Sequence, residues 1–168
     1  MTIVETYKGY EIRVQIYIAS DGLGAAPTSW NEGSTGVNLL GVATSASTSG
    51  SASATDITGL NQQEPYNTKQ GNISYEWSIS QLYTLSEWTD SSSTNINPMD
   101  MLGSGKKCAI QISGMSAAGE DSSTNELDIV LTRCSVDSDE LSVEGSEGDW
   151  TLTMSGRAAT RDASSHEA

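Results

Sequence analysis

Apolar and polar residues alternate along several short segments of the chain, which is typical of strands with one buried face. The segments are residues 10–18, 72–82, 107–112, 127–133 and 150–157. In residues 10–18, one face carries Tyr10, Ile12, Val14, Ile16 and Ile18, and the other carries Glu11, Arg13, Gln15 and Tyr17. In residues 72–82, one face carries Ile73, Tyr75, Trp77 and Ile79, and the other carries Ser74, Glu76, Ser78 and Ser80. We expect the apolar faces to form one core.

A Ser-, Thr- and Ala-rich segment at about residues 41–58 interrupts this pattern. Its composition suits a flexible linker. Its place between strands that must reach one core favours a long extended loop or hairpin that turns near Ser49 and Gly50. Such a hairpin buries too little to be stable alone, so neighbouring subunits would have to pair with it or pack on it. The inter-subunit candidates here are Ser45, Ser49, Gly50 and Ala54.

One short helix is predicted after Asn97, which can cap it, with Pro98 in the first turn and Asp100 favouring the helix dipole. Gly103 is expected to end it, and the pattern at 82–88 also allows a short helix. The acidic stretch 134–149 is expected to be a loop, and 160–168 a frayed end. The pattern predicts one domain over 1–168, mainly β: a β-sandwich or partly closed barrel with one short flanking helix.

The charge of the chain narrows the classes of partner. Its 168 residues carry 22 acids and 8 bases, a formal net charge of −14, which argues against a module that grips nucleic acid. Three interpretations stay open: adaptation to a salt-saturated cytoplasm, a passage through which a polyanion slides, or an ordinary solvated surface. No apolar run approaches the about 18 residues of a membrane span, and the first residues lack the features of a signal peptide.

The residues needed for chemistry are missing or badly placed. His166 is the only histidine and lies three residues from the end, where an imidazole cannot be positioned for catalysis. Cys108 and Cys134 each fall in a predicted strand, and the sequence does not say whether they are paired. No metal-ligand or phosphate-loop spacing is complete. We therefore expect no enzyme, cofactor or metal. The basic pair Lys106 and Lys107 has two interpretations: a solvated surface, which is the common case for such pairs, or a contact with acids of an adjacent subunit.

The closing strands carry a resemblance to a known family. A strand at 127–133, a loop, and a strand ending in Ser155-Gly156-Arg157-Ala158 resemble the C-terminal end of tail tube (major tail) proteins of long-tailed viruses. The order of elements resembles that family over most of the chain, most specifically over 105–158. The extreme acidity departs from the family and suggests a virus of a halophilic archaeal host.

The resemblance implies a two-sheet sandwich with a flanking helix. Its subunits would form rings, by resemblance hexamers, which stack so that one sheet from each subunit joins a barrel around a channel for DNA delivery. The implied partners are the chain itself and the tape measure, tail terminator and distal tail proteins, without a membrane. The implied location is the virion tail, assembled in the host cytoplasm; ring stoichiometry, contractility and host stay open.

DNA should pass such a channel without specific binding, because each basic contact would slow it. The candidate lumen-facing residues are Glu11, Gln15, Ser74, Glu76 and Ser78, which alternate with core residues, although the sequence does not say which sheet face lines the channel. A binding or decoration module of the carbohydrate-binding or adhesin type is the alternative. Its platform would use Trp30, Trp77, Trp88 and Trp150, of which Trp77 and Trp150 are expected in the core instead.

Overall fold

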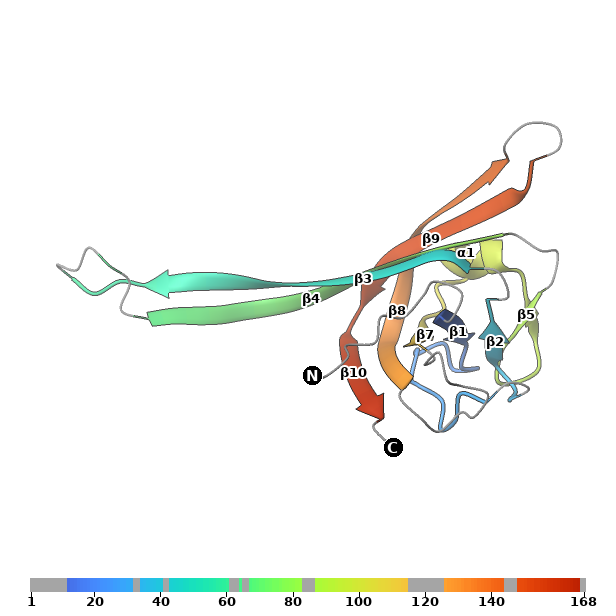
Figure 1. The fold of residues 1–168 in the computed structure, drawn as a ribbon, viewed down its shortest axis with the longest axis horizontal. Helices are drawn as coiled ribbons and strands as arrows, with labels where there is room; N and C mark the ends of the chain where they lie inside the picture. The colour runs from blue at the N-terminus through green and yellow to red at the C-terminus, as the bar shows by residue number, and fades with distance from the viewer. Residues whose placement is uncertain are drawn as a thin grey trace, which may run out of the picture.

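The computed structural model describes residues 12–31, 34–40, 43–60, 64, 67–82, 87–114, 126–143 and 148–166. Within these residues the chain forms ten strands and one short helical segment (Figure 1). The strands are β1 Ile12–Tyr17, β2 Val37–Leu39, β3 Ala43–Ile57, β4 Asn67–Leu82, β5 Trp88–Thr89, β6 Asn95–Ile96, β7 Cys108–Gly114, β8 Glu126–Val143, β9 Trp150–Ala158 and β10 Thr160–His166. The helical segment is a 3-10 turn, η2 Pro98–Asp100, followed by α1 Met101–Ser104. The fold is mainly β with one short helix, as the sequence predicts.

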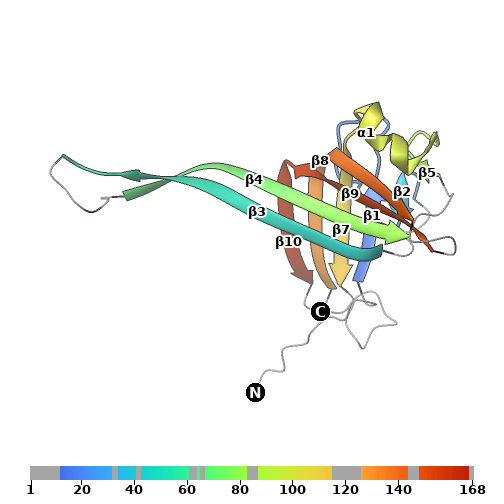
Figure 2. The ribbon, with the colours of Figure 1, turned by 90° about the horizontal axis from the view of Figure 1, so that it is seen from above.

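The strands pair in the order β2-β1-β7-β8-β9-β4-β3, and β10 also pairs with β8. The first half of β8 pairs with β7 and β10, and its second half pairs with β9. This single strand therefore belongs to two layers, which we call the first sheet (β2, β1, β7, β10 and residues 126–134 of β8) and the arm sheet (residues 135–143 of β8, β9, β4 and β3). Figure 2 shows the long strands of the arm sheet crossing those of the first sheet.

The change of layer occurs at Arg133, whose φ of 53° lies in the left-handed region. Its N–H donates to the carbonyl of Gly24 at 2.7 Å. Gly24 has φ +73°, and a Cβ there would lie 2.8 Å from the Cα of Arg133, so only glycine allows this approach. The loop predicted for 134–149 is thus wrong for residues 134–143, which continue β8 beyond the bend. Backbone pairing with β9 holds this acidic segment in a strand while its polar side chains reach solvent.

The predicted fraying of residues 160–168 is also wrong for Thr160–His166. This segment is β10, which pairs with β8 from Thr160 opposite Thr132 to His166 opposite Glu126. The hydroxyls of Thr132 and Thr160 lie 2.6 Å apart and share a hydrogen bond. Main-chain pairing at a sheet edge needs no apolar alternation, so the polar composition concealed this strand.

The core lies between the two layers and is built from the predicted apolar faces. Its buried members include Val14, Ile16, Trp77, Ile79, Cys108, Ile110, Leu131, Leu152 and Met154. Trp88 is buried as well, whereas Trp150 is 52% exposed, so the core position expected for Trp150 is wrong. Trp150 starts β9 opposite Val143, beyond the end of the core. Trp30 makes an edge-to-face contact with Tyr17, with ring centroids 6.4 Å apart.

Removing core volume should lower stability strongly. Leu131 is 0% exposed in the shared strand β8, so Leu131→Ala loses buried area and leaves a cavity. We expect the free energy of unfolding to fall by about 2–5 kcal/mol, measured by denaturant titration. The control, Leu60→Ala at a 99% exposed side chain, should stay within about 0.5 kcal/mol of the wild type. Similar losses for both variants would contradict this location of the core.

The helical segment begins as predicted. The Asn97 side chain accepts from the N–H of Met99 at 3.0 Å, and Pro98 occupies the first turn. The segment ends at Gly105, with φ +65°, and not at Gly103, which lies inside α1. The sequence also allowed a short helix at 82–88. Its two end residues are in strands, because Leu82 is the last residue of β4 and Trp88 the first of β5. Residues 83–86 lie outside the described residues.

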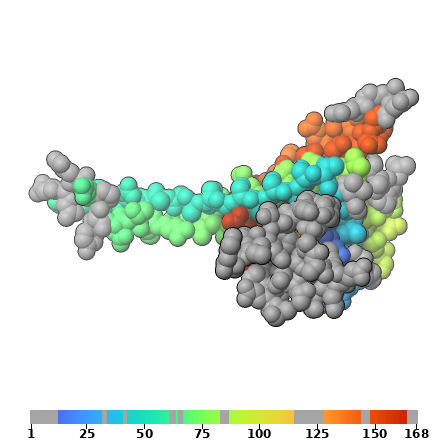
Figure 3. Space-filling view, in the orientation of Figure 1, coloured from blue at the N-terminus to red at the C-terminus, as the bar shows by residue number. Residues whose placement is uncertain are grey.

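The segment at 41–58 is one half of a longer hairpin. β3 runs through Ser49 and Gly50 without turning and pairs with β4 from Ala43 opposite Gln81 to Ile57 opposite Asn67, so the predicted turn at Ser49-Gly50 is wrong. β4 begins to pair with β9 only at Tyr75. Residues 51–57 and 67–74 therefore pair only with each other, and we call them the arm. Figures 1 and 3 show the arm as a narrow projection from one end of the body.

Candidate assembly surface

The face of the arm sheet that is turned away from the core is coated with hydroxyl groups. One cross-strand row contains Ser47, Ser78, Ser155 and Ser138, and the next contains Ser49, Glu76, Arg157 and Ser135. The hydroxyls of Ser138 and Ser155 lie 2.6 Å apart, and those of Ser80 and Thr153 lie 2.9 Å apart. These rows alternate with Trp77, Ile79, Leu152 and Met154, which are buried in the core. We call this surface the polar face; it holds an open groove of about 520 Å³.

The charges on the polar face are mostly acidic, and its base is paired. Arg157 is the only base among the groove's lining residues, and its Nε donates to Oδ2 of Asp137 at 2.7 Å. That hydrogen bond lowers the pKa of Asp137 and raises the pKa of Arg157, to which the nearby charge of Glu76 also contributes. Both partners are well exposed, so this pair adds little stability. Its effect is to leave the groove without a free cation among its lining residues.

The sequence analysis named Arg157 only as part of the closing Ser-Gly-Arg-Ala stretch and did not propose it as a site residue, although a signal was present. Thr151, Thr153, Ser155 and Arg157 share one face of β9 opposite Leu152 and Met154. The same alternation that identified the face of β4 would have identified this one. Its carboxylate partner Asp137 falls in the part of β8 that was expected to be a loop.

The predicted lumen-facing residues do not form one group. Ser74, Glu76 and Ser78 lie together on the polar face of β4. Gln15 lies in the first sheet, between β2 and β7, and is only 2% exposed. It is therefore unavailable to line a channel, and the prediction is wrong for this residue because its nominally polar face of β1 is covered. Glu11 lies outside the described residues.

Among the described residues, the part of the arm sheet that lies in the body has two edges with which no strand pairs. β3 forms one edge over its whole length, and residues 135–143 of β8 form the other. All four predicted inter-subunit residues of the 41–58 segment, Ser45, Ser49, Gly50 and Ala54, lie on the β3 edge. Long open edges are an aggregation hazard unless another strand pairs with them. A contact within the chain also favours glycine at position 50. A Cβ there would lie 2.9 Å from the Arg161 guanidinium, which stacks 5.0 Å from the Tyr75 ring centre.

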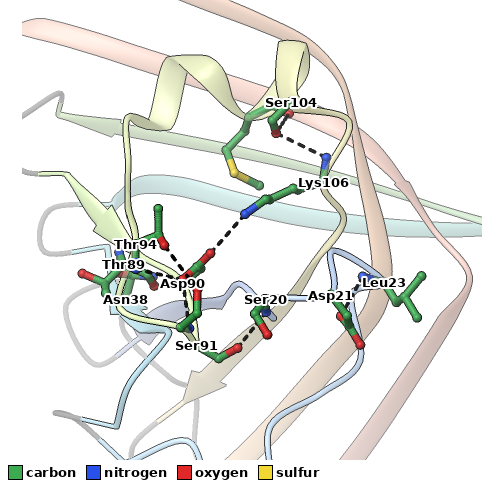
Figure 4. Close-up of polar contacts among 12 residues, drawn as sticks. Ser20, Asp21, Leu23, Asn38, Thr89, Asp90, Ser91, Thr94, Ser104 and Lys106 are labelled. Atoms are coloured by element: carbon green, nitrogen blue, oxygen red, sulfur yellow. Dashed lines mark hydrogen bonds and ion pairs between the residues drawn. The ribbon is translucent and has the colours of Figure 1, made fainter.

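Lys106 has a partner within its own chain. Its Nζ lies 3.0 Å from Oδ2 of Asp90, a carboxylate that is 2% exposed (Figure 4). Asp90 also accepts from the Ser92 hydroxyl at 2.7 Å and the Thr94 N–H at 3.0 Å. Lys106 therefore has an acidic partner in its own chain, whereas Lys107 is exposed. A contact of either lysine with an adjacent subunit stays a prediction.

These contacts make part of the stability pH-dependent. The hydrogen bond from Ser92, then that from Thr94 and the contact with Lys106, hold the pKa of Asp90 well below its ordinary range. The unfolded carboxyl takes up a proton near its ordinary pKa of about 3.9, so the contribution is complete above that pH and is lost as the pH falls. We expect Asp90→Asn to lower the unfolding midpoint at pH 7 and to differ less from wild type at pH 3. Asp149→Asn, at an exposed carboxylate, is the control; a difference that stays constant with pH would contradict this role of Asp90.

Nothing in the described part of the chain suggests catalytic chemistry. No group of three or more His, Cys, Asp or Glu side chains is placed there to hold a metal ion. Cys108 and Cys134 are opposite each other in β7 and β8 but are free and buried thiols. The hydrogen bond between the two thiols, followed by burial, raises the pKa of Cys134, which makes it unreactive. Among the same residues, no helix has the length and apolar character needed to span a bilayer.

No protein-family model matches the sequence, and no curated protein matches it. Solved structures do match. The SPP1 tail tube aligns with a TM-score of 0.63 and 10% identity over 97% of this chain and 81% of that one. The fold is that of tail tube proteins. The tube-terminating cap of the anti-feeding prophage aligns with a TM-score of 0.64 and 11% identity, over 98% of this chain and 95% of that one. The tail of an empty gene transfer agent particle aligns with a TM-score of 0.52 and 13% identity, over 95% of this chain and 98% of that one. At these identities the tail-tube-like likeness is one of fold.

Proposed function

We propose that the protein is a structural subunit of a viral tail tube that assembles into stacked hexameric rings around a channel for DNA. The observation that carries this proposal is the arm sheet, with a hydroxyl-coated face and two open edges. The shared fold with the SPP1 tail tube supports it, and the C6 symmetry of the gene transfer agent tail supports the choice of six copies. A subunit needs no catalytic group for this task.

The direction of the strands fits a closed ring. β8, β9, β4 and β3 are antiparallel in turn, so β8 and β3 at the two edges run in opposite directions. Rotation about a ring axis preserves strand direction, so β3 of one copy would meet β8 of the next in the antiparallel sense. Six copies would give a barrel of about 24 strands, roughly 45–52 Å across at normal strand spacing and tilt. Closure would pair the β8 edge of each copy with part of the β3 edge of the next.

The polar face would line the channel, and the apolar face would remain in the subunit core. Ser74, Ser78 and Glu76 would then meet the passing DNA, with Arg157 held by Asp137. The hydroxyls and acids that line the groove offer a polyanion no free cation to bind, which suits genome ejection. Tape measure, tail terminator and distal tail proteins would be the further partners in the virion tail, which is assembled in the host cytoplasm.

Cross-linking between the two edges tests ring formation directly. Ser47 and Ser138 belong to the outer strands of the arm sheet, with two strands between them. Three strand spacings are roughly 14 Å, which is too far for a disulfide within one subunit. We expect Ser47→Cys combined with cysteine at position 138, 140 or 142 to give an oxidised ladder that ends at six subunits. Each single variant is the control and should give no ladder. Assembled tubes without a ladder at any of the three positions would contradict edge-to-edge closure.

The binding-module alternative loses its main support. Trp77 and Trp88 are 3% and 6% exposed, so the four tryptophans cannot form one platform for a sugar. The polar face carries no aromatic ring on its hydroxyl rows.

The acidity also gives an expectation for a halophilic host. Ten acids and one base, Arg133, lie between Glu120 and Trp150, and the screening length falls to roughly 3 Å at 1 M salt. We expect the thermal unfolding midpoint to rise as salt is raised from low to molar concentrations, followed by circular dichroism. A flat response would remove the halophilic interpretation and leave the tube proposal in place.

A further inference from the structure

A small basic surface surrounds Leu23. The Gly22 carbonyl accepts from the Lys107 N–H at 3.0 Å, and the Gly24 carbonyl accepts from the Arg133 N–H at 2.7 Å. Leu23 is thereby fixed between the two basic residues, and its side chain is 65% exposed. Lys107 and Arg133 are exposed as well. We call Leu23, Lys107 and Arg133 the basic patch.

The two basic side chains of this patch form no ion pair within the described part of the chain. The ion pairs there involve Lys106 and Arg157 but neither Lys107 nor Arg133. The nearest acid in the sequence is Asp21, whose carboxylate already accepts from the Leu23 N–H at 2.9 Å. In a chain of net charge −14, two free bases beside an exposed leucine are a distinctive surface. Their natural partner is acidic and carries a large apolar side chain.

The chain itself presents such a partner at the end of the β8–β9 hairpin. Val143 and Trp150 face each other there and are 45% and 52% exposed. The carboxylates of Glu140 and Asp149 are exposed close to them in the sequence, and no base occurs from residue 137 to 149. We call Val143, Asp149 and Trp150 the hairpin tip. Figure 1 shows this hairpin projecting from the end of the body that lies opposite the arm.

The two surfaces cannot meet within one subunit. Arg133 lies at the bend of β8 and Val143 at its end, ten residues further along, which is roughly 33 Å of strand. Resting on the proposed function, we infer that the hairpin tip of one copy docks on the basic patch of a neighbouring copy. Trp150 contacts Leu23, and Asp149 meets Lys107 and Arg133. The contact joins two different surfaces, so it repeats from copy to copy and extends the assembly.

Charge reversal tests the pairing. Lys107→Glu and Asp149→Lys should each weaken self-association about tenfold, measured by sedimentation at fixed salt. The variants should associate again when they are mixed, because the reversed charges then face each other, and the double variant should behave like wild type at the same net charge. Failure of mixing to restore association, with both single variants weakened, would overturn the pairing.

A second measurement locates the contact. Leu23→Cys and Trp150→Cys variants, mixed and oxidised, should give a cross-linked dimer, and Leu102→Cys mixed with Trp150→Cys, both at exposed positions, should not. The buried native cysteines should leave unsubstituted protein uncross-linked. Rings or tubes without the Leu23–Trp150 link would overturn this docking and leave the tube proposal standing. Wild-type protein that stays monomeric would overturn both.

Discussion

Proline at one of two successive positions of β3, Ser47→Pro or Thr48→Pro, will abolish ring formation and leave the monomer folded. Successive N–H groups of an antiparallel edge strand point alternately to the partner strand and outward. Proline removes one N–H, so one variant loses a bond to β4 and the other loses only an outward donor. The outward donor is the one that β8 of the next copy would use. Its loss, repeated at every junction, should leave no assembled rings by electron microscopy.

The two prolines serve as each other's control. Thermal unfolding will identify the variant that loses a bond to β4 by its lower midpoint, because proline at an edge position is tolerated only where no ladder bond is broken. The expected result is that the more stable variant is monomeric by sedimentation while wild type forms rings under the same conditions. Normal rings from the more stable variant would contradict closure through the β3 edge.

Shortening the arm will stop rings from stacking. Residues 51–57 and 67–74 are exposed in the subunit, so the arm contributes little to the stability of one copy and must find its contacts in other copies. Replacing residues 53–72 by Asn-Gly keeps Ala52 opposite Ile73 and closes the hairpin with a two-residue turn. We expect a soluble subunit with an unchanged unfolding midpoint that forms rings but no tubes.

Replacing residues 53–72 removes paired residues from β3 and β4 together, so that neither strand loses its partner in the body. Deleting residues 45–54 alone would leave β4 without its partner at Ile79, Trp77 and Tyr75, so a failure to assemble would report damage to the sheet. A control that exchanges only Ser51→Ala tests a single side-chain contact, the 2.9 Å hydroxyl pair with Ser74, and should stack normally. Tubes of wild-type length from the shortened arm would show that stacking does not need it.

Strands with one buried face were predictable because burial imposes alternation. Ile16, Ile79 and Leu152 fell on apolar faces in the sequence and are 0–1% exposed. The second half of β8 and all of β10 were missed because backbone pairing holds them and few of their side chains are buried. Residues 72–82 were predicted as a strand, but the pairing of β3 with β4 was missed because β4 starts ten residues beyond the end of β3 and carries polar residues at its start.

The candidate surface was predictable only where a single strand defines it. Ser74, Glu76 and Ser78 share a face by alternation alone. Arg157 and its pairing with Asp137 needed the register of β8 and β9, and the pairing of Lys106 with Asp90 needed the tertiary fold. Gln15 has the same alternation as Glu76, yet it is buried, because alternation says which residues share a face and not which face stays open.

Electron microscopy of the purified wild-type protein tests the central claim most directly. The account predicts tubes or stacked rings with sixfold end views, whose inner wall is the polar face with Glu76 and Ser78 toward the channel. Monomers that stay dispersed at every protein concentration in molar salt, or a channel lined by Lys107 with Glu76 on the outer surface, would contradict it.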